Sequence, residues 1–234
     1  SAGAVVVAED SATALSGTST ALSLDLDSTG AITDDGTADV TVTNLADFAG
    51  TSVTVDDTMN FGSLTFNSAG AVVVAEDSAT ALSGTSTALS LDLDSTGAIT
   101  DDGTADVTVT NLADFAGTSV TVDDTMNFGS LTFNSAGAVV VAEDSATALS
   151  GTSTALSLDL DSTGAITDDG TADVTVTNLA DFAGTSVTVD DTMNFGSLTF
   201  NSAGAVVVAE DSATALSGTS TALSLDLDST GAIT

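Results

Sequence analysis

The sequence predicts an all-β fold, a β-solenoid (parallel β-helix) in which the chain coils around an axis and each coil pairs with its neighbours. Three observations predict it: an internal repeat without substitutions, short runs of alternating apolar and polar residues, and the absence of proline. Alternation places the apolar members of a run on one face of a strand. Because proline cannot donate to a backbone ladder, its absence leaves every strand free to pair.

The repeat is 67 residues long. The string SAGAVVVAED begins at Ser1, Ser68, Ser135 and Ser202, and no position differs between copies. Three full units and one partial unit therefore span residues 1–67, 68–134, 135–201 and 202–234. Since each unit of such an array contacts its neighbours, the core follows the axis. We expect one continuous solenoid rather than separate domains.

Six runs within one unit have the character of β-strands. They are residues 5–7, 22–26, 31–33, 40–43, 52–55 and 63–66. Gly, Asp, Asn and Ser lie between these runs and favour turns. We find no convincing helix, and residues 9–15 are only a marginal candidate. Phe48, Phe61, Phe66 and Met59 are expected to fill the core or cap strand ends.

The unit divides into three related segments, residues 40–62, 63–84 and 85–106, each with two strands and two turns. This division predicts about three coils per unit, or about 14 Å at about 4.8 Å per coil. Identical acidic residues would then lie farther apart than the Debye length of about 8 Å at physiological salt. The alternative is a tandem series of small β-sandwiches, although such domains are normally nearer to about 100 residues.

The chain carries 34 Asp and Glu residues and no Lys, Arg or His. Nucleic-acid binding is unexpected, because phosphate neutralisation needs cationic side chains. Attraction to anionic membrane surfaces is unexpected for the same reason, and the apolar run at residues 2–8 is too short to span a bilayer. Cations are therefore the expected small partners. The high apolar fraction of 42% distinguishes the chain from a disordered acidic segment.

Acidic pairs at the expected turns are candidate calcium ligands. Calcium prefers several oxygen ligands in a flexible arrangement, and turn carboxylates with backbone carbonyls would supply them. The candidates are Glu9, Asp10, Asp34, Asp35, Asp56 and Asp57, with their equivalents in the other units. The pattern is neither an EF-hand loop nor the glycine-rich nonapeptide of calcium-binding β-rolls. A solvated acidic surface that keeps the protein soluble is the competing interpretation.

We do not expect an enzyme. Paired carboxylates serve glycosidases, but the chain has no Arg, Lys, His, Tyr or Trp to bind a sugar or tune a pKa. Serine and threonine are abundant, yet no His or Lys is present to activate a nucleophile. Apart from calcium, no cofactor is expected.

The segments GAITDDGTADVTVTNLADFAG, SVTVDDTMNFGSLTF and AGAVVVAEDSATALSGTST resemble the repeats of filamentous-haemagglutinin-like bacterial surface proteins. The likeness covers the whole chain, because the chain is one unit repeated. It implies a right-handed parallel β-helix, export, and a role in adhesion or surface structure. The repeats of that family are usually degenerate, whereas these are identical, which favours a repetitive fibre.

Two functions follow from these expectations. In the first, the chain is a structural component of an extracellular fibre or sheath and associates with itself end to end or laterally, because a stacked solenoid has no natural end without a capping repeat. In the second, the repeats form the stalk of a large secreted adhesin that projects a separate binding domain. A calcium-stabilised surface-layer or matrix protein is a further alternative. A distinct binding domain elsewhere in the protein would favour the stalk.

Overall fold

The computed structural model describes residues 3–234 and contains β-strands and turns but no helix among them. The chain forms two compact units, Ser1–Thr118 and Ser119–Thr234, whose boundary lies inside the second sequence repeat. In the first unit the strands are β1 (Ala4–Glu9), β2 (Thr13–Leu15), β3 (Thr18–Ala21), β4 (Ser23–Ser28), β5 (Ile32–Asp34), β6 (Asp39–Gly50), β7 (Val53–Ser68), β8 (Ala71–Glu76), β9 (Thr80–Leu82), β10 (Thr85–Ala88), β11 (Ser90–Ser95), β12 (Ala98–Asp101) and β13 (Asp106–Gly117).

The second unit begins with the equivalent of β7 and continues the series of strands. They are β14 (Ser119–Ser135), β15 (Ala138–Glu143), β16 (Thr147–Leu149), β17 (Thr152–Ala155), β18 (Ser157–Ser162), β19 (Ala165–Asp168), β20 (Asp173–Gly184), β21 (Ser186–Ser202), β22 (Ala205–Glu210) and β23 (Ser224–Ser229). No helix of residues 3–234 has the length and apolar character needed to cross a membrane.

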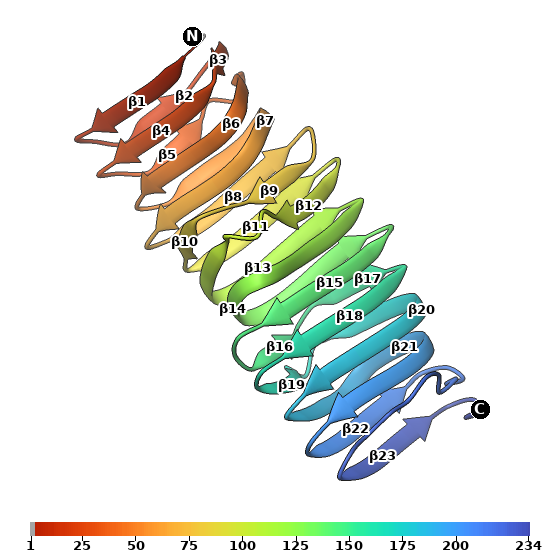
Figure 1. Ribbon diagram of the computed structural model, residues 1–234. Coiled ribbons are helices and arrows are strands. Elements are labelled where there is room, and N and C mark those ends of the chain that lie inside the picture. Colours follow the sequence, from red (N-terminus) through yellow and green to blue (C-terminus); the bar gives the residue numbers. More distant parts are fainter. Residues whose placement is uncertain (1–2) are drawn as a thin grey trace. The chain divides into compact units, whose positions relative to one another are not determined.

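Within each unit the strands pair in parallel with strands one coil away, which confirms the β-solenoid (Figure 1). In the first unit β1 pairs with β4 and β4 pairs with β6, so these strands lie side by side. A β-sandwich is built from antiparallel sheets, so the alternative of tandem sandwiches is wrong. Phe48, Phe61, Phe66 and Met59 are fully buried, as the core assignment predicts.

Two ladders form the walls of the first unit. The first joins Val5, Leu24, Ala46, Leu64 and Leu82, at spacings of 19, 22, 18 and 18 residues. The second ladder joins Thr13, Ile32, Val53, Val72, Leu91 and Ala113. The chain passes alternately from one wall to the other, so each coil crosses both walls once.

The coil spacing of about 19 residues corrects the prediction of three coils per repeat. A 67-residue sequence repeat forms about three and a half such coils. Because of the extra half coil, the next repeat begins on the other wall. Val5 lies in the first ladder, whereas Val72, the same residue of the next repeat, lies in the second. Within each compact unit, the same residue of two successive repeats therefore lies on opposite walls.

The prediction failed because strands in this fold run past the corners. β6 has 12 residues and β7 has 16, and each continues from one side of the coil to the next. Register shifts between Val42 and Leu45, and between Val55 and Met59, mark these corners. The sequence division counted such corner residues as separate turns and so made each coil too long.

Candidate functional site

Three carboxylates from neighbouring coils meet at one corner of the solenoid, here called the acidic corner. In the first unit it consists of Asp34, at the end of β5, and Asp56 and Asp57 in β7. In the second unit it consists of Asp168, Asp190 and Asp191, whose carboxylate oxygens lie within 4.8 Å of one another. The structure thus brings together three of the six candidate positions from residues about one coil apart.

Backbone N–H groups hold the acidic corner in place. Asp34 Oδ2 accepts hydrogen bonds from the N–H groups of Asp56 at 2.6 Å and Asp57 at 3.2 Å. Asp57 Oδ2 accepts one from the Ala38 N–H at 2.9 Å. The donors are available because β7 shifts register after Val55 and its backbone turns away from the ladder. Asp34 and Asp57 therefore already accept hydrogen bonds from the backbone N–H groups that this bend leaves unpaired.

Asp35 does not join the acidic corner. Its Oδ1 atom accepts hydrogen bonds from the N–H of Thr37 at 3.0 Å and from the Thr37 hydroxyl at 2.6 Å. This local turn is completed by Gly36, whose φ of 79° is in the left-handed region that favours glycine. Asp35 consequently stabilises its own exposed loop.

Like charges and burial act on the acidic corner. Partial desolvation, followed by the neighbouring charges of Asp34 and Asp57, raises the pKa of Asp56. In the second unit desolvation raises the pKa of Asp168, with a further rise from Asp191 and Asp190, although two backbone N–H groups oppose it. A divalent cation would relieve this repulsion, and carboxylate oxygens are the ligands that calcium prefers.

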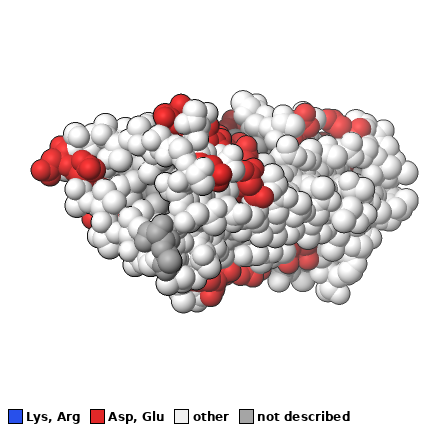
Figure 2. Space-filling view, turned by 90° about the horizontal axis from the view of Figure 1, so that it is seen from above, with Lys and Arg blue, Asp and Glu red and all other residues white. Residues whose placement is uncertain are grey.

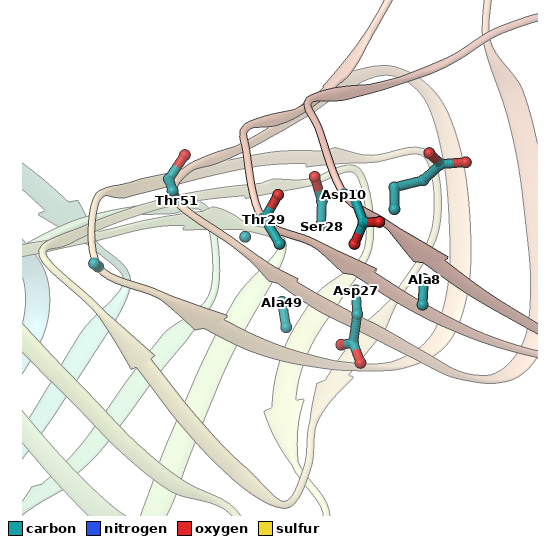
Figure 3. A pocket seen from close by; sticks show the side chains of 10 residues that line it. Ala8, Asp10, Asp27, Ser28, Thr29, Ala49 and Thr51 are labelled. Carbon is teal, nitrogen blue, oxygen red and sulfur yellow. The ribbon is translucent and has the colours of Figure 1, made fainter.

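Glu9 and Asp10 lie apart from the acidic corner, at the end of β1. They are exposed and line a shallow groove of about 350 Å³, together with the small residues Ala8 and Ala49 and with Asp27 (Figure 3). The same groove recurs in the second unit, where Glu143 and Asp144 replace Glu9 and Asp10. Ala8 and Ala49 lie on the coils on either side of Asp27, and their small side chains leave the groove open.

The equivalents of Glu9 in the later repeats have a different environment. Glu76, Glu143 and Glu210 are each only 2% exposed. The Glu76 carboxylate accepts a hydrogen bond from the Phe61 N–H at 3.1 Å. Repeat position alone therefore does not determine whether this glutamate is solvated, since burial requires a preceding coil that covers it.

A second acidic cluster lies on the outer face of the wall and was not among the sequence candidates. Asp25 of β4 and Asp47 of β6 are direct partners in adjacent coils. Burial, then the charges of Asp25 and Asp27, raises the pKa of Asp47. On the face seen in Figure 2, acidic side chains gather in separate patches with uncharged surface between them. The alternating pattern LSLDLDS predicts that Asp25 faces outward, but only the strand register shows that Asp47 of the next coil lies beside it.

We expect the substitution Asp47→Asn, made together with Asp114→Asn and Asp181→Asn, to stabilise the protein. Like charges directly opposite on paired strands cost about 0.2–1 kcal/mol, and the amide removes that repulsion. The measurement is the urea midpoint at low salt and at 1 M NaCl, where screening shortens the Debye length to about 3 Å. The gain should shrink at high salt. A gain that is independent of salt would contradict an electrostatic origin.

Comparison with protein-family models, curated proteins and solved structures finds no match to this chain.

Proposed function

We propose that the chain is a structural component of an extracellular bacterial fibre, filament or sheath made of stacked β-solenoid repeats. The observation that supports this most is the parallel backbone pairing of each coil with the next, within and between the identical sequence repeats. Such a ladder offers backbone groups at its open edge to a further coil. The partner in this proposal is another copy of the chain, joined end to end or laterally.

The surface of the solenoid suits this use. The chain has no Lys or Arg, so proteases that cut after these residues find no site. The net charge of −34 makes separate chains repel one another in solution. A dry core of Val, Leu, Ile and Phe runs beneath the outer polar rows in each unit.

Electron microscopy of the native assembly tests the fibre. We expect uniform filaments with strands stacked about 4.8 Å apart and a repeat of about 17 Å for each sequence unit, given three and a half coils. A monomer that remains dispersed at high concentration and high salt, where charge repulsion is screened, would contradict self-assembly. Filaments with a repeat near about 14 Å would instead contradict the coil count.

A calcium-stabilised array is the second candidate, because the acidic corner collects three carboxylates within 4.8 Å in the second unit. We expect millimolar calcium to raise the melting temperature relative to EDTA, since a ligand at about 100 times its Kd stabilises by about 2.7 kcal/mol. The variant Asp168→Asn should reduce this gain, whereas Asp169→Asn, which changes the neighbouring turn aspartate, should retain it. An identical melting temperature in calcium and EDTA would remove the calcium proposal.

A further inference from the structure

Each later repeat buries one glutamate in a place where the chain offers little to stabilise a negative charge. Glu76, Glu143 and Glu210 are 2% exposed. The printed sequence contains no Lys, Arg or His that could pair with them. An ionised carboxylate buried without a cationic partner is costly, and such a group commonly becomes neutral instead.

Each of these carboxyl groups accepts a hydrogen bond from one backbone N–H, and one side-chain hydroxyl adds a weaker stabilisation of the charged form, from Thr80 at Glu76, Ser145 at Glu143 and Ser212 at Glu210. Phe61 N–H donates to Glu76 at 3.1 Å, Phe128 N–H donates to Glu143 at 3.1–3.2 Å, and Phe195 N–H donates to Glu210 at 3.1 Å. Glu210 also receives a long hydrogen bond of 3.5 Å from the Ser212 hydroxyl, while its Oε1 atom is buried without a partner. A carboxylate stabilised by hydrogen bonding alone normally accepts two or three N–H groups.

A threonine follows each of these glutamates by four residues. Thr80, Thr147 and Thr214 are each 1% exposed, and the Thr80 side chain hydrogen-bonds Glu76 and lowers its pKa, although less than burial raises it. A hydroxyl can donate to a carboxylate or accept from a carboxylic acid, so these threonines fit either form of the glutamate.

The charged groups around the glutamate all favour the neutral form. Asp77 follows Glu76, Asp56 and Asp57 lie in the facing strand β7, and Asp94 lies in β11, which pairs with β8. These neighbours are all carboxyl groups. Their charges oppose a further negative charge at Glu76.

We propose that the buried Glu76, Glu143 and Glu210 hold protons in the folded solenoid at mildly acidic pH that the unfolded chain has already released, so that folding of these coils takes up protons. Burial raises the pKa of Glu76 and Glu143 to about 7, against the lowering effect of the Phe N–H groups, and raises the pKa of Glu210 in the same direction. The inference concerns the fold and holds whether or not the chain forms a fibre.

The sign of the pH dependence follows from these directions. Between the unfolded value of 4.5 and the folded value of about 7, the folded chain retains protons that the unfolded chain releases. Stability therefore falls as pH rises through this window, by about a tenfold change in the folding equilibrium constant per pH unit for each of Glu76 and Glu143. Below the window both states are protonated, and above it the penalty is complete.

Carbon-13 NMR of the wild-type chain, labelled at the glutamate carboxyl carbon, tests the proposal. The chain has only four glutamates, Glu9, Glu76, Glu143 and Glu210, and the exposed Glu9 provides an internal reference. We expect the carboxyl signals of Glu76 and Glu143 to titrate near pH 7, with that of Glu210 displaced from Glu9 in the same direction. Four carboxyl signals that titrate together in the acidic range would overturn the proposal.

A variant provides a second, independent readout. The combined substitution E76Q, E143Q and E210Q keeps a carbonyl acceptor for the Phe N–H groups and adds an amide donor near the threonine hydroxyls. The folding equilibrium of this variant should lose the steep dependence on pH between about 5 and 7, and the variant should be more stable than the wild type at pH 8. The matched control E9Q changes the same charge at the exposed copy and should keep the wild-type slope. An unchanged slope in the triple variant would contradict proton uptake at these sites.

Discussion

Replacement of Phe61 with alanine, together with its equivalents Phe128 and Phe195, is expected to lower the free energy of unfolding by about 3–5 kcal/mol per copy. The Phe61 side chain is fully buried, and its ring centroid lies 5.6 Å from that of Phe48 in β6. Truncation removes this aromatic contact and leaves a cavity in a core only two walls thick. Urea denaturation followed by circular dichroism measures the loss.

All three copies must change at once. Because the repeats are identical, an unaltered repeat would mask the damage to its neighbour in a bulk measurement. The control is Asn60→Ala with its equivalents, which removes an exposed side chain and one hydrogen bond from the Ser78 hydroxyl and should cost only about 1 kcal/mol per copy. A loss below about 1 kcal/mol per copy for the Phe61 series would mean that these rings do not hold the core together.

The substitution Gly62→Ala, with Gly129→Ala and Gly196→Ala, is expected to cost about 3 kcal/mol per copy, at the upper end of the usual range for overpacking. A Cβ atom at Gly62 would overlap the Thr43 carbonyl oxygen, and one at Gly196 would overlap that of Thr177. The obstacle is backbone at the β6 register shift, so it cannot rotate away as a side chain would.

Thermal melting measures the effect of the Gly62 series. Gly3→Ala is the control, because a Cβ atom there meets nothing within 4 Å. A melting temperature for the Gly62 series equal to that of Gly3→Ala would show that β6 and β7 do not approach as closely as the structure has them.

The β-strands and the parallel stacking could be predicted from sequence because each depends on a local pattern. Residues 63–66 alternate, and the structure buries Leu64 and Phe66 while Ser63 faces outward. The number of coils could not be predicted in the same way. It depends on how many residues pass each corner, and β6 and β7 pass corners without leaving the strand conformation.

In the candidate site too, the local sequence predicts the turns but not the contacts between residues of different coils. The sequence predicts acidic pairs at turns, and the adjacency of Asp34 and Asp35 in the sequence suggested that these two residues act together. Instead Asp34 contacts the backbone of Asp56, 22 residues later, because register brings them together. The buried glutamates were missed. One signal was present, since Glu76 closes the apolar run of β8 with its side chain on the buried face.

The half coil at the end of each repeat has a consequence for changes in array length. Arrays of identical sequence repeats are prone to gain or lose copies. One repeat more or less leaves the backbone ladders intact. It also rotates whatever follows by half a turn, because Val5 and Val72 occupy opposite walls. The gain or loss of one repeat would therefore change the direction in which an attached segment faces as well as its distance.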